Sequence, residues 1–130
     1  MKITYLVARL LLGLVMAVFG SNVYLQFMPP GPMPPGPLAD FTHALFSSHY
    51  LYAIGIFQVV PGLLLLANRY VPLALALLAP VIVNICFIHI FMAPSGLPLA
   101  AVVVILWLIV FYRVRGAFSG IFRRDPPFEA

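Results

Sequence analysis

Residues 73–92 read LALALLAPVIVNICFIHIFM, a run of 20 residues that contains no Lys, Arg, Asp or Glu. Asn84 and His89 are its only strongly polar members. A helix needs about 20 predominantly apolar residues to cross the hydrocarbon core of a bilayer. The run therefore predicts a membrane-spanning helix, and Pro72 precedes it at a position where the first turn of a helix tolerates proline.

Three further apolar runs are of similar length and are separated by turns and helix breakers: residues 3–27, 50–67 and 97–112. Together with the run at 73–92 they predict an all-α fold, a transmembrane four-helix bundle that forms one domain over residues 1–112. The composition agrees, because 64% of the 130 residues are hydrophobic and 8% are charged, whereas about 25% are charged in soluble domains. So few charges cannot cover so large an apolar surface in water, and the predicted partner is the lipid bilayer.

The two ends of the chain carry most of the charge. Lys2 gives a basic start, but Arg9 interrupts the first apolar run and no small-x-small cleavage site follows. We therefore expect an uncleaved helix rather than a signal peptide. Residues 113–130 are basic and then contain a Pro126-Pro127 pair, which predicts a cytoplasmic tail that is partly disordered.

The first predicted loop is rich in proline. Residues 28–37 read MPPGPMPPGP, the unit MPPGP written twice, which predicts a stiff connector of polyproline type. The following residues, 38–48, predict a short helix at the outer interface, with Asp40 as its amino-terminal cap.

Basic residues fall on one side of a four-span arrangement, because an even number of spans brings both termini and the Asn68-Arg69 turn together. The residues on that side are Lys2, Arg69, Arg113, Arg115, Arg123 and Arg124, with Arg9 near that end of its helix. The opposite loops hold Asp40, His43 and His49 but no Lys or Arg. The positive-inside rule predicts that both termini are cytoplasmic. Because the basic residues form no continuous stripe, no nucleic acid partner is predicted.

Polar side chains recur inside the predicted spans, and five of them gather in the outer half of the bilayer: Asn22, Gln26, Gln58, Asn84 and His89. Such side chains either hydrogen-bond between helices or mark a functional site. Two alternatives follow, interhelical hydrogen bonding or a ligand pocket lined by these five residues. No metal site is predicted, because no two histidines stand four apart on one helix.

Small residues line one face of each of two predicted helices: Gly13, Ala17 and Gly20 in the first, and Gly55 and Gly62 around Gln58 in the second. They predict faces at which two helices approach closely. Arg9 lies about a turn and a half into the first helix, and we expect its guanidinium to snorkel to the inner headgroups.

Several catalytic signatures are missing from the sequence. No acidic residue lies within a predicted span, and the chain has no Gly-rich phosphate loop, no HExxH motif and no nucleophile elbow. We therefore predict no catalytic residue and expect no enzymatic activity from the isolated chain. Cys86, the single cysteine, is expected to be a packing residue.

Four stretches in this order resemble the DoxX-like family of small four-helix bacterial membrane proteins: Ala8–Phe19 (ARLLLGLVMAVF) followed by Asn22, the MPPGP loop, Gln58–Leu66 (QVVPGLLLL) and Val71–His89 (VPLALALLAPVIVNICFIH). The resemblance implies a bundle in the bacterial cytoplasmic (inner) membrane. The family is similar to DoxD, a membrane subunit of thiosulfate:quinone oxidoreductase. The resemblance therefore also implies soluble redox or sulfur-handling partners. This chain has Gln58 where family members often carry an acidic residue, so the resemblance does not extend a proton-handling role to that position.

The resemblance and the polar residues together predict a membrane subunit of an oxidoreductase system that binds quinone or a similar lipophilic molecule. His89, Gln26 and Asn22 would then donate hydrogen bonds to the carbonyl oxygens of the ligand. Two alternatives stay open, a small oligomeric transporter or permeability factor, and a structural anchor that recruits soluble redox partners through its basic tail. A second copy of the chain is a further predicted partner.

Overall fold

The computed structural model describes residues 1–125, in which all regular structure is helical. The elements are α1 (Lys2–Leu25), α2 (Pro37–Ser47), α3 (Tyr50–Leu66), α4 (Val71–Phe91), η1 (Pro94–Gly96), α5 (Leu97–Val114) and η2 (Arg115–Phe118). The all-α prediction is confirmed, and the ends of the four long helices lie within two residues of the predicted ones. The predicted disorder around Pro126 and Pro127 falls outside the described residues.

Three helical segments are long and apolar enough to cross a membrane: Lys2–Leu25, Val71–Phe91 and Pro94–Phe118. The helices α2 and α3 meet the same criterion only as a pair, and a bend of 87° separates them. On its own, α3 has 17 residues, a rise of about 25 Å against the roughly 30 Å of a hydrocarbon core. Three to four helices therefore have the length and composition expected of a multi-pass membrane protein.

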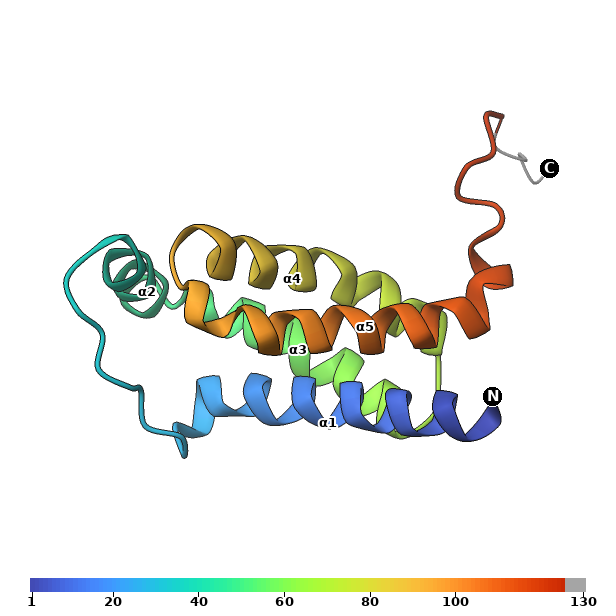
Figure 1. Ribbon diagram of the computed structural model, residues 1–130, viewed down its shortest axis with the longest axis horizontal. Coiled ribbons are helices and arrows are strands. Elements are labelled where there is room, and N and C mark those ends of the chain that lie inside the picture. Colours follow the sequence, from blue (N-terminus) through green and yellow to red (C-terminus); the bar gives the residue numbers. More distant parts are fainter. Residues whose placement is uncertain (126–130) are drawn as a thin grey trace.

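The four long helices lie side by side, and successive ones run in opposite directions (Figure 1). Both α1 and α4 pack against α3 and against α5. The start of α1, the turn between α3 and α4 and the end of α5 therefore lie at one end of the molecule, and α2 lies at the other. Fully buried side chains from all four helices form the core between them, among them Leu12, Leu65, Leu75, Leu78 and Val110.

Glycine allows α1 and α3 to approach closely. A Cβ atom on Gly13 would lie 2.9 Å from the carbonyl oxygen of Gly62, and one on Gly62 would lie 2.7 Å from the backbone nitrogen of Ala17. Nearer the other end of the pair, a Cβ on Gly20 would lie 2.8 Å from the Cβ of Gln58. The predicted small-residue packing faces are thus confirmed, because any larger residue at these positions would push the two backbones apart.

The prediction that Arg9 snorkels to the headgroups is wrong, because this residue is only 5% exposed. Its Nη1 donates hydrogen bonds to the carbonyl oxygens of Leu65 and, at 3.2 Å, of Leu66. Those carbonyls belong to the last turn of α3, where the helix leaves oxygens without intrahelical partners and carries a partial negative charge. Arg9 therefore ties α1 to the carboxyl-terminal end of α3. The sequence does not reveal this proximity.

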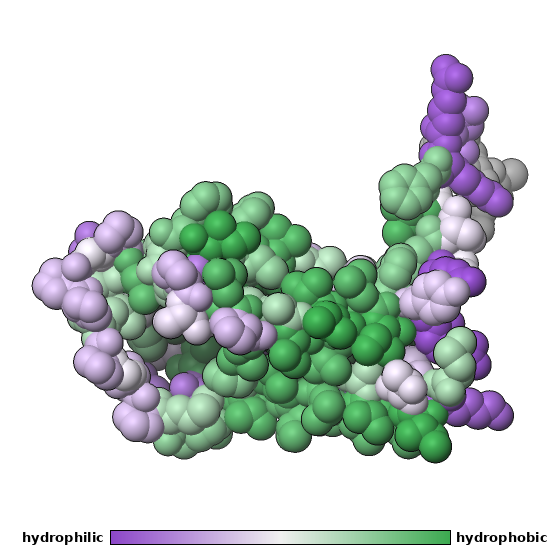
Figure 2. Space-filling model, in the orientation of Figure 1, coloured by the Kyte–Doolittle hydropathy of each residue, from purple (hydrophilic) through white to green (hydrophobic). Residues whose placement is uncertain are grey.

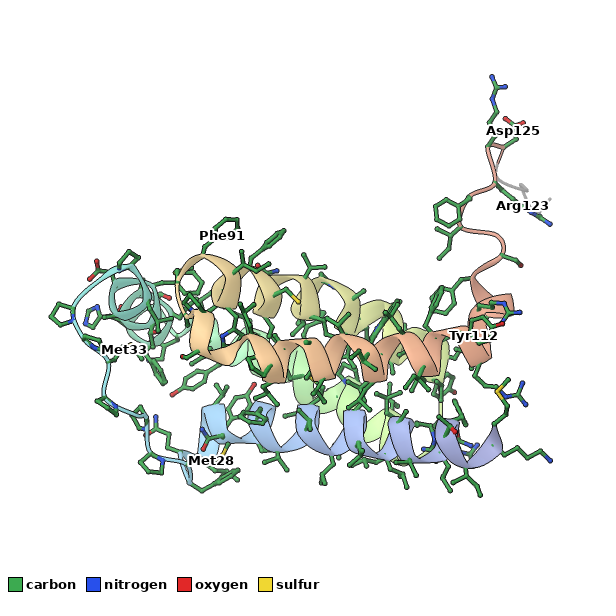
Figure 3. All side chains as sticks on the ribbon, in the orientation of Figure 1. Met28, Met33, Phe91, Tyr112, Arg123 and Asp125 are labelled. Carbon is green, nitrogen blue, oxygen red and sulfur yellow. The ribbon has the colours of Figure 1, made fainter. Side chains whose placement is uncertain are left out.

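The face of the helical body seen in Figure 2 is mostly apolar, whereas hydrophilic residues gather at its two ends. At the basic end, Arg115 packs over Tyr112, with its guanidinium carbon 4.0 Å from the ring centroid, and Nη1 donates to the Tyr112 carbonyl at 2.8 Å. Tyr112 marks this end of α5 in Figure 3, and the tail with Arg123 and Asp125 extends away from the helices.

The Pro-rich connector and α2 form the opposite end of the molecule. Residues 26–36 contain no helix, and the stretch from Met28 to Met33 runs from α1 toward α2 (Figure 3). Pro37, predicted as the last connector residue, is instead the first residue of α2, and Gly36 occupies the cap position. Asp40 therefore lies in the first turn rather than at the cap, where its negative charge still suits the helix dipole.

Candidate functional site

A cavity of about 280 Å³ lies between the four long helices, in the half of the molecule that is nearer α2. Most of its lining is apolar and comes from α1, α4 and α5; two polar side chains, Gln58 of α3 and His89 of α4, complete it. Phe19 and Leu99 are also part of the lining and are each nearly half exposed. Because they belong to α1 and α5, the cavity reaches the outer surface between these two helices.

His89 is held in place by the end of its own helix. Its Nδ1 lies 3.1 Å from the carbonyl oxygen of Ala93. A carbonyl oxygen only accepts hydrogen bonds, so Nδ1 carries the proton and donates it. Gly96 lies on the same edge of the ring, where its backbone nitrogen also donates to the Ala93 carbonyl at 3.0 Å. The turn after α4 therefore fixes the orientation of the imidazole that lines the cavity.

Gln58 reaches the cavity because α1 presents no side chain at Gly20. The stem of Gln58 lies against that glycine, and its amide makes no hydrogen bond within residues 1–125. Arg9 Nε is the only unpartnered side-chain nitrogen or oxygen that is sealed from solvent in this part of the chain, so the amide of Gln58 and Nε2 of His89 are both reachable. Unsatisfied polar groups in an apolar cavity are costly, and a ligand that bonds to them removes that cost.

The other three predicted site residues lie outside the cavity lining. Asn22 accepts a hydrogen bond from the backbone of Met28 at 2.8 Å and so helps to end α1. Gln26 is exposed in a left-handed conformation with φ of 49°. Asn84 is exposed and donates to the Pro80 carbonyl of its own helix at 2.9 Å. The structure thus brings together two of the five, and a role in ligand binding for the remaining three stays a prediction.

The sequence reading missed the part played by Ala93 and Gly96. The sequence did offer one indication, the turn Ala93-Pro94-Ser95-Gly96, which begins four residues after His89. A chain that turns about one helical turn after a residue comes back close to the side chain of that residue. Trp107 was also missed as an interhelical contact, and its indole Nε1 donates to the Leu75 carbonyl of α4 at 3.1 Å.

Two other hollows are wide, mostly apolar grooves, although the first is also lined by Thr4, Tyr112 and Arg113. One of about 390 Å³ lies between the start of α1 and the end of α5, and one of about 460 Å³ lies between α4 and α5 beside Cys86. Within residues 1–125, no three His, Cys, Asp or Glu side chains lie close enough together to hold a metal ion. The cavity with Gln58 and His89 is therefore the best candidate for a ligand site in the described part of the chain.

Comparison with known proteins gives no further information on this cavity. No family model matches the chain, and no curated protein and no solved structure matches it.

Proposed function

We propose that this chain is a DoxX-like integral membrane protein of the bacterial inner membrane, a transmembrane four-helix bundle with both termini in the cytoplasm. Two features support the topology. All four long helices carry exposed large hydrophobic side chains, and the helix ends with Lys2, Arg69 and Arg113 lie at one end of the molecule. The positive-inside rule favours the cytoplasm for that end.

In this arrangement the cavity lies in the outer half of the membrane and binds quinone or a similar lipophilic ring. The observation that carries the proposal is the pairing of an apolar lining with two reachable polar groups, Gln58 and His89. Ligand sites typically combine these features, because the apolar walls supply affinity and a few polar groups fix the orientation. With no water in the hydrocarbon core, a ligand is the natural partner for these groups.

The size of the cavity matches one substituted ring. A cavity of about 150 Å³ accommodates benzene, and this one measures about 280 Å³. A longer apolar tail would leave between α1 and α5, past Phe19 and Leu99, and continue among the lipid chains. The chain then serves an oxidoreductase system as the subunit that holds the lipophilic electron carrier.

Thermal unfolding of the purified protein in detergent tests ligand binding. A short-chain quinone analogue at a hundred times its Kd should stabilise the folded state by about 2.7 kcal/mol. The matched variants are Gln58→Ala in the cavity and His43→Ala on the exposed face of α2. The stabilisation should shrink in the first and persist in the second. No shift in the wild type, or an equal shift in all three proteins, would contradict the proposal.

The tail provides a second contact, with a soluble redox partner. Phe122 is 93% exposed, and the neighbouring Arg123 and Arg124 are exposed as well. An exposed aromatic beside two arginines suits an acidic partner surface, because aromatic and arginine residues are enriched in protein interfaces. Exchanging Phe122, Arg123 and Arg124 for Ser should abolish binding of that partner and leave the thermal shift by the quinone analogue unchanged. Partner binding by this triple variant at wild-type affinity would exclude the tail as the contact.

A further inference from the structure

We infer that the cavity selects the reduced, hydroxyl-bearing form of its ligand, a phenol or hydroquinone, over the oxidised form that offers only carbonyl oxygens. The feature responsible is His89 Nε2, which the structure makes a hydrogen-bond acceptor. The inference rests on the proposed function, because it names the chemical class of ligand in the same cavity.

His89 carries its proton on Nδ1. Its Nδ1 lies 3.1 Å from the Ala93 carbonyl oxygen, which can only accept. The same oxygen accepts from the Gly96 backbone nitrogen at 3.0 Å, so both of its lone pairs are used. The Nδ1–H tautomer is the one that this network requires, and in a neutral imidazole it leaves a lone pair on Nε2. Nε2 therefore accepts a hydrogen bond, which replaces the donor role toward a ligand carbonyl that the sequence predicted for His89.

The imidazole ring of His89 cannot reverse without losing a hydrogen bond. Gly96 lies so close that a Cβ on it would be 2.1 Å from both Cε1 and Nδ1 of His89. Rotating the ring by half a turn would replace Nδ1 with a carbon and break the hydrogen bond to Ala93. Nδ1 is thus occupied by its hydrogen bond to the turn after α4, and Nε2 is the ring nitrogen that a ligand can reach.

Two polar groups remain for a ligand, His89 Nε2 and the amide of Gln58. Within residues 1–125, His89 Nε2 makes no hydrogen bond and is not sealed from solvent. The amide of Gln58 can donate or accept, so it suits a hydroxyl and a carbonyl equally. Discrimination therefore falls to His89. A hydroxyl group donates to Nε2, whereas a carbonyl oxygen at the same place sets two lone pairs against each other.

The expected preference is about tenfold, the size that one net hydrogen bond gives. Such a preference also changes the chemistry of a bound redox couple. Tighter binding of the reduced form raises the midpoint potential of a two-electron couple, by about 30 mV for a tenfold difference in affinity. The cavity would then make the bound carrier a better oxidant than the same carrier free in the bilayer.

The test compares two ligands that differ in whether the ring oxygen carries a proton or a methyl group. 4-Propylphenol and 4-propylanisole have similar shapes and neither is redox-active under the conditions of a titration. We expect the wild-type protein to bind the phenol about tenfold more tightly than the anisole. In His89→Leu the ratio should fall to about one, and in the control His43→Leu it should stay at the wild-type value. The wild-type comparison needs no variant, so a failure of His89→Leu to fold leaves the test intact.

Nitrogen-15 NMR of labelled histidine gives an independent readout of the tautomer. The His89 signals should report a protonated Nδ1 and an unprotonated Nε2, and the phenol should shift the Nε2 signal. Equal or tighter binding of the anisole, or a proton found on Nε2 of the neutral ring, would overturn this inference while leaving the proposed ligand site standing. If neither compound nor a quinone analogue binds, the proposed function itself fails.

Discussion

Gly96 and His89 form one interlocked unit, since a Cβ atom at Gly96 would lie only 2.1 Å from two atoms of the imidazole ring. The contact joins the η1 turn to the last turn of α4, and the Ala93 carbonyl bonds to both residues. A backbone position seven residues along the chain thus orients His89 Nε2, the nitrogen that we propose discriminates between ligands.

Gly96→Ala should therefore disturb the ligand site without adding any polar group. The new methyl group has to displace either the turn or the imidazole, which breaks the bond from Nδ1 to Ala93. We expect a destabilisation of about 1–3 kcal/mol from overpacking and a loss of the preference for phenol over anisole. Gly116→Ala is the matched control, because a Cβ there meets no atom within 4 Å. A fully retained ligand preference in Gly96→Ala would show that the ring is held by something else.

Gly62→Ala should weaken the contact between α1 and α3. The added Cβ would lie 2.7 Å from the backbone nitrogen of Ala17, and a backbone atom cannot rotate away as a side chain can. We expect a net loss of about 1–3 kcal/mol in the free energy of unfolding, despite the roughly 1 kcal/mol by which Ala favours a helix over Gly. Reversible unfolding in mixed detergent measures it, with Gly120→Ala as the control in open space. An unchanged free energy would mean that the helices can separate at no cost.

Arg9→Ala should be more damaging than loss of an exposed arginine. The substitution leaves the Leu65 and Leu66 carbonyls without the guanidinium and opens a void beside them. We expect a loss of about 2–4 kcal/mol, measured by the same unfolding assay. Arg69→Ala, at an exposed position in the next turn, should change stability by at most about 0.5 kcal/mol. Similar effects of the two substitutions would argue against the burial of Arg9.

Cysteine accessibility in intact cells tests the proposed topology. In a Cys86→Ser background, a cysteine at Asp40 should react with a membrane-impermeant maleimide added from outside. A cysteine at Arg124 should react only after the membrane is permeabilised, because the positive-inside rule places the basic end in the cytoplasm. Labelling of both positions from the same side would rule out four spans with cytoplasmic termini.

The helices were predictable from the sequence because the thickness of a bilayer sets the length of an apolar run, and the breakers between runs mark the ends. The direction in which each side chain points, toward the cavity or toward the outer surface, was harder to predict. Around α4 almost every position is apolar, so the pattern does not show that Asn84 faces outward while His89, five residues later, lines the cavity. The predicted position of Arg9 was wrong for a related reason. Its hydrogen-bond partners are backbone carbonyl oxygens of another helix, and every residue type has such an oxygen, so the sequence does not identify them.

The unequal lengths of α1 and α3 have a consequence for the surrounding lipid. The 24 residues of α1 rise about 36 Å, whereas the 17 residues of α3 rise about 25 Å. In the proposed four-span arrangement, a bilayer that matches the length of α1 is too thick for α3, so the lipid beside α3 becomes thinner while α1 tilts. The chain should consequently accumulate in thin regions of a membrane and avoid thick, ordered ones.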